Sequence, residues 1–305
     1  MPQLPLPVVR AAVRPAYRLA LNARLPYPVQ RRLLELVAPI QTLPEGTVVQ
    51  QVTLAGRPAE RVTVGATERP TAVLYLHGGG YTVASPATHR SLAAHLAAAS
   101  GSAVYVLDYR LAPEHPYPAA LDDAVGAYLE LVTEHGVTPQ TAAIAGDSAG
   151  GGLTVAAARR LIDRHGVRPA ALGLIAPWAD PASRDFPLDR DTVLNAAWIS
   201  ASARAYLGDR DASDPGYAPL RGDLTGLPPT LIHVGTGEML YPQVTEFARK
   251  LREAGVDVTV TEQRELWHVA HLQAALVGEA ADAVAQLGAF LRSHVLGEPR
   301  LRDDG

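Results

Sequence analysis

The chain has 305 residues, of which 48% are apolar and 19% charged, and its 27 basic and 31 acidic residues give a formal net charge of −4. This composition predicts a globular protein with enough apolar material for a large core, and the lack of a broad positive field argues against nucleic acid as a partner. No stretch approaches the roughly 18 consecutive apolar residues that a membrane-spanning helix needs, so we expect no membrane span.

The residues up to about Pro44 are predicted to form an N-terminal helical segment interrupted by prolines. They lack the basic start, the uninterrupted apolar middle and the cleavage site of a secretory signal, because Pro5, Pro7 and Pro15 break the segment. The chain contains no cysteine, which fits a reducing compartment and excludes a thiolate nucleophile or a thiolate metal site. We therefore expect a cytoplasmic protein.

Three arginines in this segment, Arg10, Arg14 and Arg18, recur every four residues, which would place them on one face of a helix. A basic face of this kind can touch membranes. Because Pro15 interrupts the pattern and the run is short, we interpret it instead as a solvated helix face.

The next segments predict a sheet. Thr47–Leu54 and Glu60–Gly65 alternate polar and apolar residues, as half-buried antiparallel strands at a sheet edge do. Continuous apolar runs, typical of strands buried on both faces, then alternate with helical segments. The predicted buried strands are Ala72–Leu76, Ala103–Leu107, Ala142–Ala145, Ala171–Ala176, Thr230–Val234 and Val256–Thr261. The predicted helices are Thr88–Ala99, Ala119–Glu134, Gly150–Arg164, Val244–Ala254 and Val269–Val295. This alternation predicts an α/β fold with a mostly parallel central sheet, helices on both faces, and ligands beyond the carboxyl ends of the strands.

One connection is too long for this regular alternation of strands and helices. Ala179–Pro228 spans about fifty residues, whereas ordinary connections have about 2 to 6. We expect an insertion after the sixth strand, at about residues 179–226, that forms a cap with the N-terminal segment 1–44 and contains a helix near Asp191–Leu207. No repeat or long linker appears, so residues 1–305 are expected to form one domain with these cap segments.

The string Gly-Asp-Ser-Ala-Gly at residues 146–150 follows an apolar strand and opens a helical run. This context is what a nucleophile elbow requires, since glycines permit the tight turn that leaves a serine hydroxyl exposed at the strand end. The sequence therefore predicts Ser148 as a nucleophile.

A second glycine-rich string, His-Gly-Gly-Gly-Tyr at residues 77–81, follows the first buried strand. Its main-chain N–H groups can approach a developing oxyanion closely, so Gly78 and Gly79, with the N–H of Ala149, are the predicted oxyanion hole. A phosphate loop is excluded because no helix starts directly after Gly80 and no Gly-Lys-Ser/Thr follows.

With these two strings and a third, Tyr109–Ala124 (YRLAPEHPYPAALDDA), the chain resembles the hormone-sensitive-lipase-like esterases of the α/β-hydrolase superfamily. The resemblance runs from about Leu74 to His268. It implies the α/β-hydrolase fold, a triad in the chain order serine, acid, histidine, and acyl chains of short to medium length.

Five histidines follow the predicted nucleophile. His165 ends a helix, His233 lies inside an apolar strand and His294 sits in the final helix, so none of them is at the carboxyl end of a strand. His268 lies between the last strand and the last helix, where a loop can bring its imidazole to the serine, and it is the predicted general base. His271, one helical turn later, is the alternative.

The predicted acid is Glu238, the only carboxylate in the loop after the strand Thr230–Val234. The family commonly has aspartate in this segment, and the neighbouring position here is Gly237. Glutamate can do the same work, since the acid need only accept the Nδ1 proton of the histidine and stabilise imidazolium. The other candidates are two carboxylates that we interpret as solvated and one in the expected cap: Glu246, Asp223 and Asp214.

Metal catalysis has no support in the sequence. His268 and His271 are three residues apart without a His-Glu-x-x-His motif, and the adjacent Asp122 and Asp123 face different directions on a helix. We expect neither a metal nor a cofactor.

The sequence thus predicts a carboxylesterase that hydrolyses small uncharged esters through an acyl-enzyme. Amide or acetyl-group hydrolysis on the same triad stays open, as does a homodimer. A noncatalytic ligand-binding relative is disfavoured because all three triad residues are present, and an interfacial lipase is disfavoured by the polar character of residues 179–226. The expected substrate-binding residues are Tyr81, Val83, Leu194, Trp198, Tyr206 and Leu240.

Overall fold

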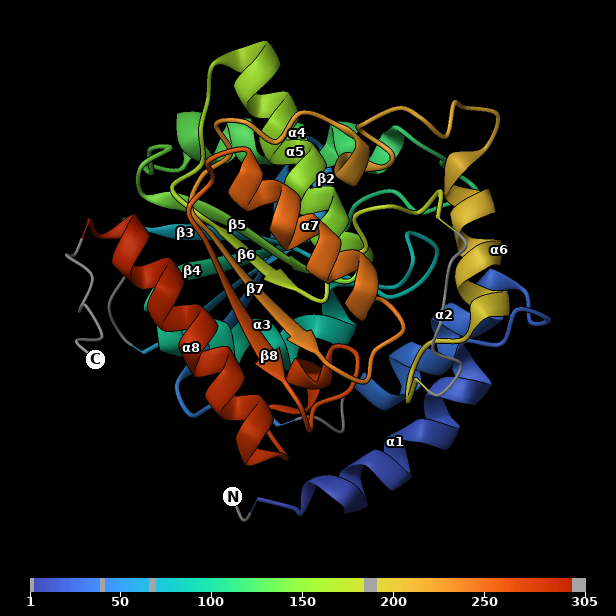
Figure 1. Cartoon of the computed structure of the whole chain (residues 1–305). Helices are drawn as coiled ribbons and strands as arrows, with labels where there is room; N and C mark the ends of the chain where they lie inside the picture. The colour runs from blue at the N-terminus through green and yellow to red at the C-terminus, as the bar shows by residue number, and fades with distance from the viewer. Residues whose placement is uncertain (1–2, 39–41, 66–69, 184–190, 298–305) are drawn as a thin grey trace.

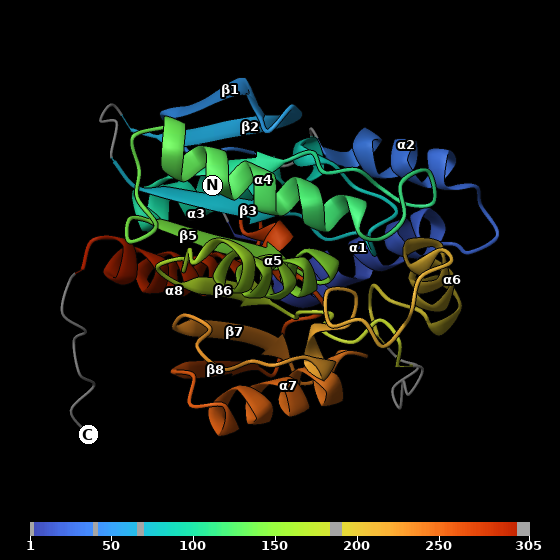
Figure 2. The same ribbon diagram turned by 90° about the horizontal axis from the view of Figure 1, so that it is seen from above.

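The computed structural model describes residues 3–38, 42–65, 70–183 and 191–297. Within these ranges, the chain forms an eight-stranded sheet in the order β1-β2-β4-β3-β5-β6-β7-β8 (Figure 2). The antiparallel pairs are β1 with β2 and β2 with β4, and all other neighbours are parallel. The strands are β1 (Thr47–Leu54), β2 (Arg57–Val64), β3 (Ala72–Leu76), β4 (Ala103–Leu107), β5 (Ala142–Asp147), β6 (Leu172–Ile175), β7 (Thr230–Gly235) and β8 (Val258–Gln263). The predicted α/β-hydrolase fold is confirmed.

Helices cover both faces of the sheet (Figure 1). On one face α3 (Pro86–Ser100) and α8 (Gly278–Val295) pack against strand side chains such as those of Val73, Val104 and Ala143. On the other face α4 (Ala119–Glu134), α5 (Ala149–His165) and α7 (Tyr241–Glu253) pack against the alternate side chains of the same strands. Strands β3 to β7 are buried throughout, because both of their faces are covered. The continuous apolar runs of the sequence therefore mark the centre of the sheet.

The N-terminal segment forms α1 (Leu6–Ala20) and α2 (Tyr27–Val37). The expectation that Pro15 would interrupt a helix is wrong, since α1 runs through it. Pro15 cannot donate to the carbonyl of Ala11, but both residues are exposed, so water can satisfy that carbonyl. Nor is Arg10 solvated as expected: its guanidinium donates to the carbonyl of Glu265.

The insertion contains α6 (Ala196–Leu207) and a short 3₁₀ turn, η2 (Pro219–Arg221). The helix starts later than the expected Asp191 because Asn195 is its N-cap and accepts from the N–H of Trp198 at 2.9 Å. Residues 184–190 of the expected cap lie outside the described residues, as do 1–2 and 39–41.

Hydrogen bonds connect the N-terminal segment to the insertion. Asn195 donates through Nδ2 to the carbonyl of Leu21 at 3.0 Å, and Trp198 donates through Nε1 to Gln30 Oε1 at 2.8 Å. In Figure 1, α1, α2 and α6 lie together beside one end of the sheet.

The helix predicted over Val269–Val295 is divided. A 3₁₀ turn, η3 (Ala270–Gln273), follows Val269 and is separated from α8 because Val277, the residue before α8, is extended (φ −122°, ψ 126°). The last strand also begins two residues later than the predicted Val256. None of the helices in the described ranges combines the length and apolar character needed to cross a membrane.

Candidate active site

Ser148 stands at the turn between β5 and α5 with φ 51° and ψ −118°, a backbone conformation that side chains with a Cβ rarely adopt. Its N–H donates to the carbonyl of Ile175 on the neighbouring strand at 2.8 Å, which fixes the turn. A Cβ at Gly146 or Gly150 would collide with the carbonyl oxygen of Leu76. The two glycines are therefore required by the close approach of β3, and the turn has the form predicted for a nucleophile elbow.

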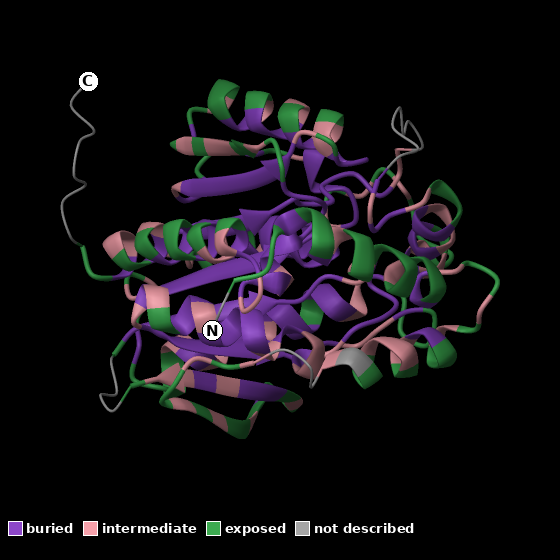
Figure 3. Cartoon of the chain, turned by 90° about the horizontal axis from the view of Figure 1, so that it is seen from below, coloured by how far each residue is buried: buried purple, intermediate pink, exposed green. Residues whose placement is uncertain are grey.

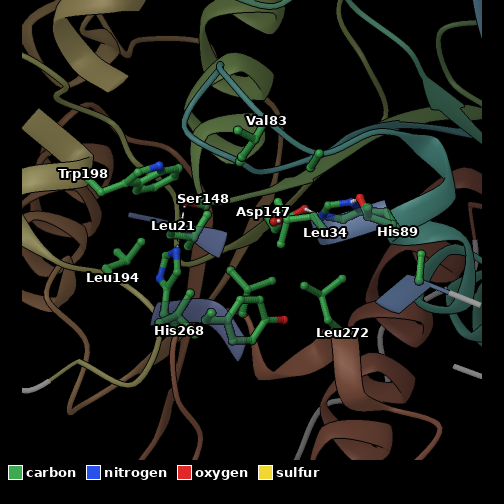
Figure 4. Close-up of a pocket in the computed structure, with 17 residues that line it drawn as sticks. Leu21, Leu34, Val83, His89, Asp147, Ser148, Leu194, Trp198, His268 and Leu272 are labelled. Carbon is green, nitrogen blue, oxygen red and sulfur yellow. Dashed lines mark hydrogen bonds and ion pairs between the residues drawn. The ribbon is translucent and has the colours of Figure 1, made fainter. Parts of the chain in front are cut away.

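The three residues predicted as a triad meet at this turn, although each comes from a different loop. His268 Nε2 lies 2.9 Å from Ser148 Oγ, and His268 Nδ1 lies 2.8 Å from Glu238 Oε2. The second carboxylate oxygen, Oε1, accepts from the N–H of Gly235 at 2.6 Å. Figure 4 shows the imidazole of His268 directed at Ser148. The imidazole is thus within hydrogen-bond distance of both a serine hydroxyl and a carboxylate, the arrangement that a nucleophile, a base and an orienting acid require.

The surroundings of His268 stabilise a positive charge on its imidazole. Burial by itself lowers the pKa of His268, but the hydrogen bond and charge of Glu238, with the charges of Asp191 and Asp147, outweigh burial and raise that pKa above its ordinary value. The ring is 3% exposed, so these charges act across little water. The site favours imidazolium, the form that a general base reaches after it takes a proton.

The other candidates for base and acid lie elsewhere. His271 Nε2 contacts His233 Nδ1 at 3.0 Å rather than the serine, and burial lowers the pKa of His271 well below its ordinary value. Glu246 is partly exposed and pairs with Arg249 on its own helix at 2.7 Å. The two remaining carboxylates each accept from a backbone N–H in their own turn, at 2.8 Å, and neither contacts the imidazole: Asp214 and Asp223.

The structure contradicts the prediction that the N–H of Gly78 is a donor of the oxyanion hole. The N–H of Gly78 donates to Asp147 Oδ1 at 3.0 Å, so it is occupied. Asp147 can accept there because β3 and β5 are neighbours in the sheet, a relationship that the sequence did not reveal. Among the described residues, none accepts a hydrogen bond from the N–H groups of Gly79, Gly80 or Ala149.

The glycine-rich loop is held from several sides. Tyr109, from the third sequence string, donates its hydroxyl to the carbonyl of His77 at 2.6 Å and stacks on that imidazole with ring centroids 4.3 Å apart. Arg31 of α2 donates to the carbonyls of Thr82 and Ala112 at 2.8 and 2.9 Å. The string Tyr109–Ala124 therefore has a structural role in this part.

A pocket opens beside Ser148, with about 690 Å³ of space that includes its open mouth. Three of the expected substrate-binding residues line it: Val83, Leu194 and Trp198 (Figure 4). The other three do not. Tyr81 and Tyr206 stack on each other in the core, with ring centroids 3.6 Å apart, because the positive φ of Tyr81 (63°) turns its ring away from the pocket. Leu240 is buried in the core beside α7.

Much of the pocket wall was missed by the sequence analysis. Its members from the N-terminal helices, the start of α3, the insertion and the loop after His268 are Tyr17, Leu21, Leu34, Ala38, Ala84, Thr88, His89, Val193, Val269 and Leu272. The only sequence signal for the N-terminal members is the helical spacing of apolar residues there, which marks a buried face without saying what it faces.

A buried carboxylate, Asp191, was also missed. Its Oδ2 accepts from the N–H of Met239 at 2.8 Å, and its Oδ1 accepts from Val193 and Leu194 at 2.8 and 3.0 Å. The carboxylate therefore joins a wall of the pocket to the loop that carries Glu238. An aspartate just before a helix indicates a local turn, but nothing in the sequence points to the distant Met239.

As for metals, no group of three or more histidine, aspartate or glutamate side chains in the described residues is arranged to hold one. The absence of a cofactor stays a prediction.

A family model described as alpha/beta hydrolase fold matches residues 73–272. The chain is 38% identical to the putative acetyl-hydrolase LipR of Mycobacterium tuberculosis, across 96% of this chain and 97% of that one. It is 41% identical to an acetyl-hydrolase of Streptomyces hygroscopicus, across 77% and 83%. Among solved structures, an esterase from the bacterial hormone-sensitive lipase family superposes with a TM-score of 0.89 at 34% identity, covering 97% of this chain and 100% of that one. The esterase EstE5, soaked with p-nitrophenyl butyrate, gives 0.84 at 38% identity, covering 90% and 92%.

Proposed function

The chain belongs to the hormone-sensitive-lipase-like esterases of the α/β-hydrolase family and is a carboxylic ester hydrolase, and from this premise we propose that Ser148, His268 and Glu238 are its catalytic triad. The observation that carries the proposal is the unbroken line of contacts from Ser148 Oγ through the imidazole to Glu238, at 2.9 and 2.8 Å. A serine hydroxyl is a weak nucleophile unless a base of this kind takes its proton.

In the proposed reaction, Ser148 Oγ attacks the ester carbonyl while its proton passes to His268 Nε2. Collapse of the tetrahedral intermediate breaks the bond to the alcohol, which leaves with that proton, and an acyl-serine remains. Water then attacks the acyl-serine, again giving its proton to the imidazole, and the acid is released as the proton returns to Oγ. Glu238 holds Nδ1 throughout and stabilises the imidazolium.

For the oxyanion hole we propose the N–H groups of Gly79, Gly80 and Ala149. The supporting observation is that these amides have no acceptor among the described residues, whereas the Gly78 amide is occupied by Asp147. Preorganised donors of this kind contribute about 10²–10³ each to the rate.

For the substrate we propose small uncharged esters with acyl chains of short to medium length. Apolar side chains such as Val83, Leu34 and Leu272 make up most of the pocket wall, and they would leave a charged acyl group without a partner. We also propose that α1, α2 and the insertion act as a cap, since each supplies part of the wall. A cytoplasmic location and a homodimer stay predictions.

Removal of acetyl groups is a second candidate on the same triad. It is favoured by the names of two relatives, which are acetyl-hydrolases. Comparing p-nitrophenyl acetate with longer acyl esters and with acetylated amines separates the candidates.

The proposed nucleophile is tested by labelling with a fluorophosphonate, followed by peptide mapping. The label is expected on the peptide that contains Ser148, and Ser148→Ala should fold normally but take up no label and show no acyl-enzyme. Labelling that persists in the folded variant would assign the nucleophile to another residue.

A further inference from the structure

The outer face of α1 carries an apolar stripe that no described residue covers. Val8, Ala12, Pro15 and Leu19 are all exposed, and Val8 and Leu19 retain 57% and 58% of their accessible surface. Their spacing of four, three and four residues puts them on one side of the helix. Leu4, just before the helix, is 45% exposed and lies one turn before Val8. Figure 3, which views the molecule from the side on which α1 lies, shows exposed residues recurring along this helix.

Arginines border this stripe on one side. At about 100° per residue, Arg14 and Arg18 fall between the apolar stripe and the buried face of α1. Both are exposed, and neither guanidinium has an ion-pair or hydrogen-bond partner among the described residues. The same holds for the guanidinium groups of Arg24 and Arg32, which follow in the loop and on α2. Residues 1–44 contain six arginines and one glutamate, although the chain as a whole has a formal charge of −4.

The inner face of the same helix belongs to the pocket. Tyr17 of α1 and Leu21, the residue directly after the helix, line the pocket that contains Ser148, so α1 lies between the pocket and the exposed stripe. The helix has 15 residues and cannot span a bilayer, so a lipid contact would leave it lying along the surface.

The arginines beside the stripe indicate which kind of partner would bind this apolar helix face. A second copy of this face would bring more arginines to the border of the stripe and no carboxylate from α1 itself, because the only acid of residues 1–44, Glu35, lies on α2. The exposed Glu265 lies beside Arg10, on the side of α1 away from the stripe. An anionic lipid surface offers apolar depth beneath the stripe and phosphates beside the arginines. The interruption at Pro15, which had argued against a membrane contact, is not present in the fold.

We propose that the outer face of α1 binds the surface of an anionic lipid membrane, with Val8 and Leu19 inserted at the boundary of headgroups and acyl chains and with Arg14 and Arg18 at the phosphates. Esters dissolved in that membrane would then be separated from the pocket only by α1. The binding itself does not depend on the proposed triad.

The experiment measures co-sedimentation of the full chain with vesicles of phosphatidylcholine alone and of phosphatidylcholine mixed equally with phosphatidylglycerol. Binding is expected on the mixed vesicles and should fall as salt is raised. Replacing Arg14→Gln and Arg18→Gln together should lower the partition coefficient by about tenfold or more, since one arginine at such a surface contributes about fivefold. Val8→Asp with Leu19→Asp should abolish binding.

Two control variants match these changes. Val48→Asp alters a residue of β1 with a similar exposure of 49%, and Arg249→Gln with Arg252→Gln removes two exposed arginines of α7. Both should bind as wild type does. All variants should hydrolyse p-nitrophenyl acetate in solution at the wild-type rate, which separates this proposal from the proposed function.

Equal binding to neutral vesicles, no binding to either kind, or retained binding in the Val8→Asp and Leu19→Asp variant would overturn the proposal. So would a dimer in sedimentation equilibrium that this variant dissociates, since the stripe would then be the contact between two copies.

Discussion

The carboxylate of Asp191 accepts a hydrogen bond from the N–H of Met239, the residue directly after Glu238, at 2.8 Å. Asp191 lies in the insertion and Glu238 in the loop after β7, so this bond joins the pocket wall to the proposed triad. The charge of Asp191 also acts on the imidazole of His268 and raises its pKa.

Removing that charge should change the pH dependence of catalysis. In Asp191→Asn, the pKa of His268 should fall, because one of the negative charges that favour imidazolium is gone while Glu238 and Asp147 remain. The base must be neutral to act, so the acid limb of kcat/KM should move to lower pH. The measurement is a pH–rate profile on a short p-nitrophenyl ester.

A control for this change is Asp223→Asn, which alters an exposed aspartate that also accepts from a backbone N–H in its own turn. Its profile should match the wild type. If Asp191→Asn loses activity at all pH values with an unmoved acid limb, the carboxylate acts through structure alone.

Glu238→Gln should reduce kcat by roughly 10²–10⁴ with little change in KM. Glutamine can still accept from the N–H of Gly235, but it carries no charge to stabilise imidazolium and can turn its NH₂ towards His268. Glu238→Asp keeps the charge and withdraws it by one methylene, so its rate should fall between the two.

The matched variant is Glu246→Gln, which changes a partly exposed carboxylate paired with Arg249 on α7 and should stay near wild type. Full activity of Glu238→Gln beside a loss in Glu246→Gln would refute the assignment of the acid.

Gly79→Ala should lower kcat by about 10²–10³, the usual contribution of one oxyanion donor. The glycine has φ 106°, and a Cβ there would collide with the carbonyl of Val83, so the loop must move. Steady-state kinetics with an active-site titration should show that the folded fraction has a low kcat rather than a high KM.

Strain alone is tested by Gly136→Ala. That glycine also has a positive φ (71°), but a Cβ would meet nothing within 4 Å. We expect a small loss of stability and unchanged kinetics, and a comparable fall in kcat would show that the effect at Gly79 is not local.

Leu34→Trp should shorten the acyl chains that the enzyme accepts, because Leu34 lines the pocket from α2. We expect kcat/KM for p-nitrophenyl hexanoate to fall by about tenfold or more, with a much smaller change for the acetate. Leu36→Trp enlarges a residue that is 73% exposed on the same helix and should leave both esters unaffected. Equal losses on both esters for Leu34→Trp would place the acyl chain elsewhere.

Chelation should not affect the reaction. Treatment with EDTA is expected to leave the rate on p-nitrophenyl acetate unchanged, since the proposed triad needs no Lewis acid. Activity that EDTA removes and zinc restores would contradict the proposed mechanism.

The sequence by itself determined where the strands lie along the chain and which three residues form the proposed triad. The buried strands can be predicted because strands that are covered on both faces consist of continuous apolar residues. The turn at Ser148 can be predicted because it requires glycine at positions 146 and 150, where a Cβ would collide with β3. Chain order and position after a strand then singled out Glu238 and His268, and the structure brings their side chains together.

Only the tertiary structure decided which way the remaining side chains and amides point. Tyr81 was expected in the pocket, but its backbone angle turns it onto Tyr206, and the amide of Gly78 is taken by Asp147 from a neighbouring strand. The pocket wall from α1 and α2 and the bond from Asp191 to the acid loop join segments far apart in the chain. Local patterns show that a residue is buried, but its partner depends on which distant segment the fold packs against it, and a single sequence carries no signal for that distance.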